Sequence, residues 1–320
     1  MKHKAVIVCL LMLALLLLPA AAPAQAPLEG FPPLNAEGFL PDNVPEFIFI
    51  DADNGVWRYA SQTLRIEIKR HTQAKPKLRW LAAEIFVKPG TDYFRMVPVD
   101  AQNMDKVQDK YKAKPVEIAK DNQLVFSMNG DYYLYRVGRT VRDKSYAIGV
   151  VIRGGQLLFD KQPKPDRDIY PPLDMLALYP DGDMRVFYAN EVTAQDLVGS
   201  GARDVLTFGP ALIREGVLRT DYKQWGTTMQ PRVAIGMVEK GHYWALVVEG
   251  RIRPSLGTTA LGTGQIMQDL GCVTAFNLDG GWSSAMVFMG KQLNQLDNDG
   301  VRDNAREQNE IMGIGQTDAY

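Results

Sequence analysis

Apolar and polar residues alternate along much of this chain with a period of two, which is typical of half-buried β-strands. The clearest case is Leu64–Lys69, in which three aliphatic residues alternate with Arg, Glu and Lys. Upstream, Phe47–Asp51 and Val56–Tyr59 flank Asn54-Gly55, and Asn-Gly between apolar runs is a strong hairpin signal. The pattern therefore predicts a β-sheet beginning near residue 47.

The same pattern predicts further strands toward the C-terminus, at Leu81–Val87, Tyr93–Val99 and Leu124–Met128, with hairpin turns at Gly154-Gly155, Asp181-Gly182 and Lys240-Gly241. Two longer segments favour a helix, Ala194–Val198 and Thr259–Leu270, and a short helix or connector is expected within 101–121. Thr259 is a candidate N-cap, and Gly271 is a typical C-terminal stop. We therefore predict a β-rich α+β fold with mixed or antiparallel sheets and few helices.

The N-terminus predicts export. A basic start and an apolar run from Ala5 to Leu18 precede small residues, as in a signal peptide. The run is about 14 residues, short of the roughly 20 that a membrane span needs. We expect residues 1–24 to be removed and the protein to be periplasmic or extracellular, with no membrane span after signal removal. Residues 25–45 then form a linker or extended arm, 46–120 a β-rich N-terminal segment, and 121–318 a single catalytic core.

Charge and rare residues exclude several function classes. The net charge is −1 with the two signs mixed, so a nucleic-acid partner is not expected. Once the signal peptide is gone, Cys272 is the single cysteine, and we interpret it as a small buried apolar residue rather than a nucleophile. His71 and His242 lie on turn-like segments, which argues against a histidine metal site or a Ser-His-Asp triad.

The most informative stretch is Cys272–Met286, which starts as an apolar strand and ends in a turn rich in polar groups. The turn carries an amide, a carboxylate, two glycines and two hydroxyls, at Asn277, Asp279, Gly280, Gly281, Ser283 and Ser284. Such a grouping can bind and act on a polar ligand. The alternative is a tight turn in which Asp279 caps its own backbone.

Three other motifs pair a glycine or proline with polar or basic groups, and each has a purely structural alternative. Asn129-Gly130-Asp131-Tyr132-Tyr133 is a turn, Phe208–Ile213 contains a Gly-Pro loop marker, and Pro231–Gly236 places Arg232 before an apolar strand. Arg232 is either a functional cation, a surface charge or a structural ion-pair partner. Glu249, in Val247–Arg251, is either functional or the end of a solvated hairpin.

Taken together, these motifs resemble the phosphodiester glycosidase family from about Leu124 to Ile314. The family's Asn-Leu-Asp-Gly-Gly-Gly-Ser-Ser turn stands here as residues 277–284, its Pro-Arg-Thr-Ala-Ile-Gly as 231–236, and its Phe-Gly-Pro-x-Leu-Ile as 208–213. Leu270-Gly271-Cys272 and a late arginine, Arg306, also match. Two positions depart: Trp282 replaces the third glycine of the turn, and Glu249 stands where the family often has Asp.

The resemblance implies hydrolysis of the bond between a sugar's anomeric carbon and a phosphodiester, with N-acetylglucosamine α-phosphodiesters as first substrates to test. A phosphate is a good leaving group, so a cation that neutralises it can replace strong general-acid help. We expect the catalytic residues to be Asp279, as base or nucleophile, with Glu249 or Asp131 as partner and Arg232 on the phosphate. Expected substrate-binding residues are Asn129, Asn277, Gly280, Gly281, Trp282, Ser283, Ser284 and Arg306.

The expected partner is a sugar phosphate or a phosphodiester-linked glycan of the envelope. We expect no cofactor; a divalent cation between Asp279 and Asp131 is conceivable chemically but not predicted. Two alternatives stay open on the same scaffold: a non-catalytic glycan or cell-wall binding protein, which Trp282 would suit as a sugar platform, and a structural protein of the envelope.

Overall fold

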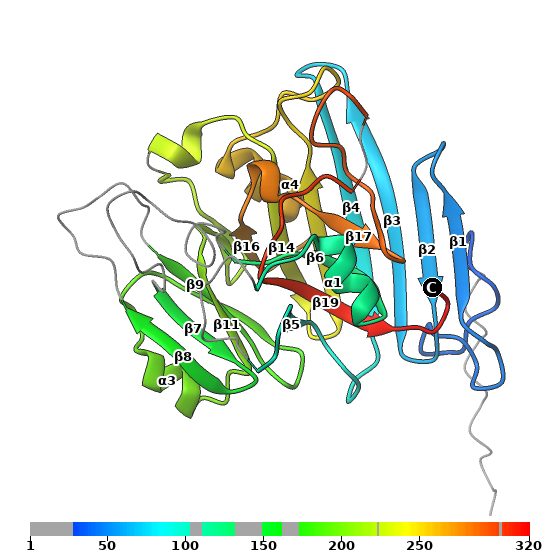
Figure 1. The fold of residues 1–320 in the computed structure, drawn as a ribbon, viewed down its shortest axis with the longest axis horizontal. Coiled ribbons are helices and arrows are strands. Elements are labelled where there is room, and N and C mark those ends of the chain that lie inside the picture. Colours follow the sequence, from blue (N-terminus) through cyan, green and yellow to red (C-terminus); the bar gives the residue numbers. More distant parts are fainter. Residues whose placement is uncertain (1–27, 103–110, 132–148, 162–172, 223, 301–302) are drawn as a thin grey trace, which may run out of the picture.

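Three antiparallel sheets form the framework of the described part of the computed structural model (Figure 1). It describes residues 28–102, 111–131, 149–161, 173–222, 224–300 and 303–320. The expected signal peptide, the start of the expected arm and the Tyr132-Tyr133 pair lie outside these residues.

The first sheet joins the N-terminal strands directly to strands from the second half of the chain. In spatial order it contains β1 (Phe47–Asp51), β2 (Val56–Ala60), β3 (Leu64–Gln73), β4 (Leu78–Val87), β15 (His242–Val248), β14 (Arg232–Glu239), β16 (Thr274–Leu278), β12 (Ala211–Arg214) and β13 (Val217–Leu218). Strand β4 pairs with β15 along its length, for example Ala83 with Ala245. The long cyan strands β3 and β4 separate the β1–β2 hairpin from the central strands (Figure 1).

Two smaller sheets complete the strand framework. One contains β10 (Met184–Phe187), β9 (Asp174–Leu178), β11 (Asp204–Phe208), β7 (Gly149–Arg153) and β8 (Gln156–Lys161). The other contains β18 (Lys291–Gln292), β17 (Met286–Phe288), β6 (Leu124–Asn129), β19 (Glu310–Gln316) and β5 (Arg95–Pro98). The strand content and the antiparallel pairing confirm the predicted β-rich α+β class.

The helices of the described residues are short, and the two near residues 194 and 260 begin where the sequence predicts. The helices are α1 (Pro115–Asp121), α3 (Ala194–Gly199) and α4 (Ala260–Asp269), with 3₁₀ turns η2 (Gln224–Thr227) and η3 (Gly281–Ser283). Thr259 caps α4 by accepting a hydrogen bond from the Gly262 N–H, as predicted. None of the helices in this part of the chain is long and apolar enough to cross a bilayer.

The main core lies between the first sheet and the two smaller ones. Alternate residues of β3, β4 and β15 point into it, including Ile66, Ile85 and Tyr243, each fully buried. The opposite face of the first sheet is covered by α4, where Met267 packs against Ala234 and Cys272. The period of two along these strands thus gives each of them two different buried or half-buried faces.

Two histidines correct the sequence reading. His71 lies in β3 and His242 begins β15, whereas both were expected on turns. His71 stacks on Trp80, with ring centroids 5.1 Å apart, and His242 stacks on Phe86 at 4.1 Å. A histidine next to other polar residues suggests a turn in sequence. Here each imidazole stacks on an aromatic ring of the neighbouring strand, which keeps it within the sheet.

Cys272 is buried, as its apolar context predicts. Burial raises the pKa of its thiol to about 12, so the thiol stays protonated at neutral pH and is a poor nucleophile.

Candidate active site

Several strand ends meet at one edge of the first sheet. Strand β14 begins at Arg232, opposite Val248 at the end of β15, and Val233 pairs with Leu278 at the end of β16. The antiparallel order therefore brings the residue after β16, Asp279, and the residue after β15, Glu249, to either side of Arg232. The turn formed by residues 277–284, which contains most of the predicted site residues, lies at this edge.

Asp279 is almost completely buried, with 6% of its surface exposed. One carboxylate oxygen accepts a hydrogen bond from the Gly280 N–H at 2.9 Å. The other accepts one from the Ser283 hydroxyl at 2.5 Å. The carboxylate does cap its own turn, as the structural alternative predicted, and it also faces the same edge as Arg232. The structural interpretation of the turn is therefore confirmed, and its functional interpretation stays a prediction.

Gly280 allows the turn to lie directly against β14. A Cβ atom at this position would come within 2.4 Å of the Pro231 carbonyl oxygen, which no side chain could tolerate. The Gly281 N–H donates to that same oxygen at 3.2 Å. The backbone that carries Asp279 is thus held beside the backbone that carries Arg232.

Arg232 is a buried cation, with 5% of its surface exposed. Its guanidinium donates to the Thr228 carbonyl at 2.9 Å and to the Thr258 carbonyl at 3.3 Å. Burial, and secondarily the positive charge of Arg251, lower its pKa to about 10. The guanidinium is still protonated at neutral pH, but burial and the nearby positive charge make its charged form less favourable. A bound anion would stabilise that charged form.

Arg251 is the second cation of the site, and it was assigned no role from sequence. It is exposed, and its backbone has a φ of 61°, a conformation that is uncommon outside glycine and often marks function. Its guanidinium donates to the Gln230 side-chain oxygen at 2.9 Å. The position of a Cβ on Gly281 would be 3.5 Å from its Nη1, so Arg251 lies beside the glycine turn.

Glu249 reaches the same edge but is committed to other partners. It is 2% exposed, so the hairpin end is not solvated as the structural alternative supposed. Its carboxylate forms an ion pair with Arg79 of β4 and accepts a hydrogen bond from the Gln295 N–H at 2.7 Å. These contacts tie β15 to β4 and to the loop after β18.

Asp131 follows β6 and also lies in an ion network. Its carboxylate accepts a hydrogen bond from the Thr207 N–H at 3.2 Å and lies 3.7 Å from the Arg153 guanidinium. Arg153 is fully buried and also pairs with Glu310. Burial lowers the pKa of Arg153, but Glu310, Asp131 and Asp204 outweigh that effect and raise it above the ordinary value. The network joins the two smaller sheets near the site.

The two predicted amides differ in how their hydrogen bonds are used. Asn129 donates to the Asp279 carbonyl at 2.8 Å and accepts from the Ala285 N–H at 3.0 Å, so it fixes both ends of the turn. Asn277 donates to the Gly209 carbonyl at 2.9 Å. Its buried side-chain oxygen has no hydrogen-bond partner among the described residues, and a buried acceptor of this kind calls for a donor.

The remaining predicted residues line the turn at different depths. Ser283 and Ser284 are fully buried, and the Ser284 hydroxyl has no hydrogen-bond partner within the described part of the chain. Trp282, by contrast, is 45% exposed. The Arg306 N–H donates to the Trp282 carbonyl at 2.9 Å, which places the late arginine beside the turn. The predicted set therefore gathers around residues 277–284, with Glu249 and Asp131 braced at its margins.

Residues that sequence reasoning missed are mostly the cations that neutralise these acids. Arg79 and Arg153 are far from the motifs in sequence, so no local pattern could link them to Glu249 or Asp131. Arg251 had a signal, because it directly follows Glu249-Gly250 in a motif already singled out. No cluster of three or more His, Cys, Asp or Glu side chains suited to a metal ion is found among the residues that the structure describes.

The sequence of this chain is similar to a protein family and to a curated protein. One family model, described as phosphodiester glycosidase, matches residues 122–314. The SPbeta prophage-derived uncharacterized protein YomE of Bacillus subtilis (strain 168) is 32% identical over 163 residues, which is 50% of this chain and 24% of that protein. The chain thus spans about a quarter of this relative's length.

Solved structures share the fold at low sequence identity. The catalytic domain of zebrafish N-acetylglucosamine-1-phosphodiester alpha-N-acetylglucosaminidase, auto-inhibited by its pro-peptide, has a TM-score of 0.58 at 16% identity, covering 79% of this chain and 83% of that one. A hypothetical protein from Synechocystis has a TM-score of 0.50 at 14% identity, covering 79% and 62%. At these identities the likeness concerns the fold alone.

Proposed function

Because this chain belongs to the phosphodiester glycosidase family, we propose that it is an exported hydrolase that cleaves the bond between a sugar's anomeric carbon and a phosphodiester. The family supports a glycosidase-type hydrolase, and it confirms the resemblance drawn from the sequence motifs.

The observation that carries the proposal is that one buried carboxylate and two guanidinium-bearing residues lie at the same sheet edge. Asp279 is held by a backbone N–H and a hydroxyl. Arg232 lies on the adjoining strand, and its pKa is lowered by burial first and by repulsion from Arg251 second. A sugar phosphodiester presents matching features, namely an electrophilic anomeric carbon next to an anion.

The two arginines suit the leaving phosphate. Guanidinium groups bind phosphate oxygens with charge-assisted hydrogen bonds. Binding the anion next to Arg232 relieves the charge repulsion and desolvation that depress its pKa. Stabilising the departing phosphate lowers the barrier in the same way that an oxyanion hole does. In this proposal Arg232 and Arg251 therefore take the place of a strong general acid.

Asp279 acts on the sugar side of the bond. Glycosidases use a carboxylate either as nucleophile or as base for an attacking water, and Asp279 is assigned that part. The hydrogen bonds from Gly280 and Ser283 orient its two oxygens, so that the reactive lone pairs are presented in one direction. The N–H groups of Gly280 and Gly281 line the same turn.

The other predicted residues are assigned to substrate contact or to support. Asn277 and Ser284 offer buried polar groups that sugar hydroxyls could satisfy, Trp282 offers an exposed ring for sugar stacking, and Arg306 reinforces the phosphate side. Asn129 positions the turn through the Asp279 carbonyl. Glu249 and Asp131 are proposed to act through their ion pairs, as positioning residues for β15 and β6.

A release assay tests the proposal. The mature chain is incubated with sugar-1-phosphodiesters, beginning with N-acetylglucosamine α-phosphodiesters, with and without a chelator, and released sugar is quantified. We expect release from at least one α-linked substrate and none from the matching sugar linked to an alcohol, because an alcohol leaves far less readily. Equal release from the alcohol glycoside would contradict the proposed role of the arginines.

Trp282 favours a second candidate function, a non-catalytic glycan-binding protein. An indole that is 45% exposed beside a polar turn can support a sugar ring without any chemistry. Saturable binding of sugar phosphates to the wild-type chain, with no release from any substrate, would support this second function.

A further inference from the structure

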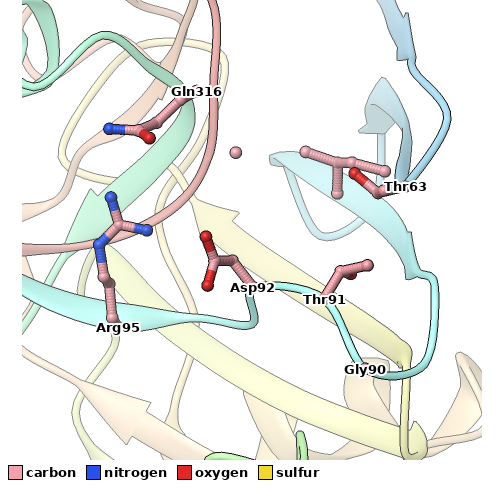
Figure 2. Close-up of a pocket in the computed structure, with 8 residues that line it drawn as sticks. Thr63, Gly90, Thr91, Asp92, Arg95 and Gln316 are labelled. Atoms are coloured by element: carbon pink, nitrogen blue, oxygen red, sulfur yellow. The ribbon is translucent and has the colours of Figure 1, made fainter.

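A cavity of about 420 Å³ opens on the part of the molecule that lies outside the family match. Its volume is within the range of small-molecule sites. Three segments meet there: the turn before β3, the loop between β4 and β5, and the end of β19 (Figure 2). The lining residues are Thr63, Leu64, Gly90, Thr91, Asp92, Arg95, Gly315 and Gln316.

Three polar side chains line this space, and two of them, Asp92 and Gln316, are exposed. Figure 2 shows the Asp92 carboxylate, the Arg95 guanidinium and the Gln316 amide around the opening. Within the described part of the chain, none of these side-chain groups has a hydrogen-bond or ion-pair partner, and Asp92 and Arg95 do not pair with each other. Two opposite charges that share a cavity without closing on each other leave room for a ligand between them.

The walls of the cavity are held in place without a ligand. The Lys88 N–H donates to the Thr63 carbonyl at 2.8 Å, and the Thr91 hydroxyl donates to the Lys88 carbonyl at 2.7 Å. On the opposite wall, a Cβ on Gly315 would come within 2.4 Å of Leu64, so β19 lies directly against β3 only because residue 315 is glycine. A site fixed in this way loses little entropy on binding.

The charges indicate the class of ligand. One carboxylate and one guanidinium disfavour a net anion or a net cation, because each would meet one group of its own sign. A sugar hydroxyl can accept from Arg95 and donate to Asp92, and Gln316, Thr63 and Thr91 add groups of both kinds. A small zwitterion would use only the two charged groups. We propose that this cavity binds a neutral saccharide unit.

The cavity is remote from the candidate active site. Glu310, at the start of β19, belongs to the ion network beside that site, whereas Gln316 at the other end of the strand lines the cavity. Seven residues of strand span about 20 Å. Resting on the proposed function, the cavity would hold another unit of the same polymer, but saccharide binding itself does not depend on turnover.

Methyl NMR of the mature chain tests the inference, with N-acetylglucosamine as the probe. Leu64 methyl groups report on the cavity, and the Trp282 indole N–H reports on the candidate active site. We expect the Leu64 signals to shift and saturate in wild type. Asp92→Asn and Arg95→Gln should each weaken that response at least tenfold and leave the Trp282 response unchanged. Asp53→Asn, an exposed aspartate on the β1–β2 hairpin, is the matched control and should behave as wild type.

Three results would overturn the inference: a shift at Trp282 without one at Leu64, a Leu64 response that neither cavity variant weakens, or saturation of Leu64 by alanine and not by the sugar. Far-ultraviolet circular dichroism of both variants checks that they fold, and Asp92 is an exposed loop residue. Turnover of phosphodiesters is measured separately on wild type, so failure of the proposed function and failure of this site are distinguishable.

Discussion

Two buried acids at neighbouring strand ends, Asp279 after β16 and Glu249 after β15, differ in the groups that hold them. Their exposed fractions are 6% and 2%, so burial does not separate them. Glu249 is paired with the Arg79 guanidinium, whereas the carboxylate contacts of Asp279 within its turn come from a neutral N–H and a neutral hydroxyl.

The partners of a buried carboxylate distinguish a structural carboxylate from a reactive one at this edge of the sheet. A carboxylate paired with a buried cation contributes mainly to stability, because its removal leaves the cation without a partner. A carboxylate whose oxygens are oriented by its own turn is placed to stabilise a developing positive centre. By this criterion Asp131, beside Arg153 and Glu310, belongs with Glu249.

The largest expected effect is on turnover when Asp279 is neutralised. Asp279→Asn keeps the shape of the turn but removes the nucleophile or base, so sugar release should fall on the order of 10³-fold. The melting temperature should change little, because the amide oxygen can still accept from the Gly280 N–H and the amide NH₂ group can donate to the Ser283 hydroxyl. Release kinetics and differential scanning calorimetry measure the two quantities.

A matched control for that variant is Asp181→Asn, since Asp181 is an exposed acid on the β9–β10 turn. It should leave release unchanged. A well-folded Asp279→Asn protein that releases sugar at the wild-type rate would remove Asp279 from the chemistry and end the comparison with Glu249.

The next largest effect is expected on the free energy of unfolding when Glu249 is neutralised. Glu249→Gln leaves Arg79 without its ionic partner and should lower the free energy of unfolding by about 2–3 kcal/mol, at the low end for a buried pair because Arg79 is partly exposed and also contacts Gln295. Urea unfolding measures the loss. Below the unfolding transition, release should fall by much less than in Asp279→Asn. Full stability with complete loss of release would instead make Glu249 a catalytic residue.

A smaller effect is expected from the two arginines. Arg251→Gln removes one phosphate ligand and should weaken competitive inhibition by inorganic phosphate about tenfold. It also removes the repulsion that helps to lower the pKa of Arg232 to about 10, so that pKa should rise. Inhibition constants measured across pH report both changes. An unchanged inhibition constant would remove Arg251 from the phosphate side.

The sign of the pH dependence follows from that shift. The pKa of Arg232 is lower in the folded protein than in the unfolded chain, so its charge opposes folding below pH 10 and this penalty is relieved as pH rises above 10. Phosphate binding, which needs the charge, should fall over the same range. In Arg251→Gln the fall should begin at higher pH; a fall at the same pH would show that Arg251 does not act on Arg232.

Alternating residues with glycine-containing turns were enough to predict the hairpins, and Thr259 was enough to predict the N-cap of α4, because each depends on neighbours in sequence. The turn at 277–284 was also predicted, since its glycines and polar residues are contiguous. What could not be predicted was which acids are neutralised. Arg79 reaches Glu249 across 170 positions, and Arg153 reaches Glu310 across 157, and only the folded sheet brings them together. The boundary at residue 121 remains a prediction.

The smallest effect is expected at Trp282, on the exposed side of the same turn. Trp282→Ala removes a stacking surface and should raise KM about threefold to tenfold with kcat nearly unchanged, because stacking binds substrate and transition state alike. Stability should hold, since the indole is 45% exposed. Trp282→Gly, which restores the residue that the family has here, is the informative partner. If both variants lower KM, the indole narrows the site instead of supporting the sugar.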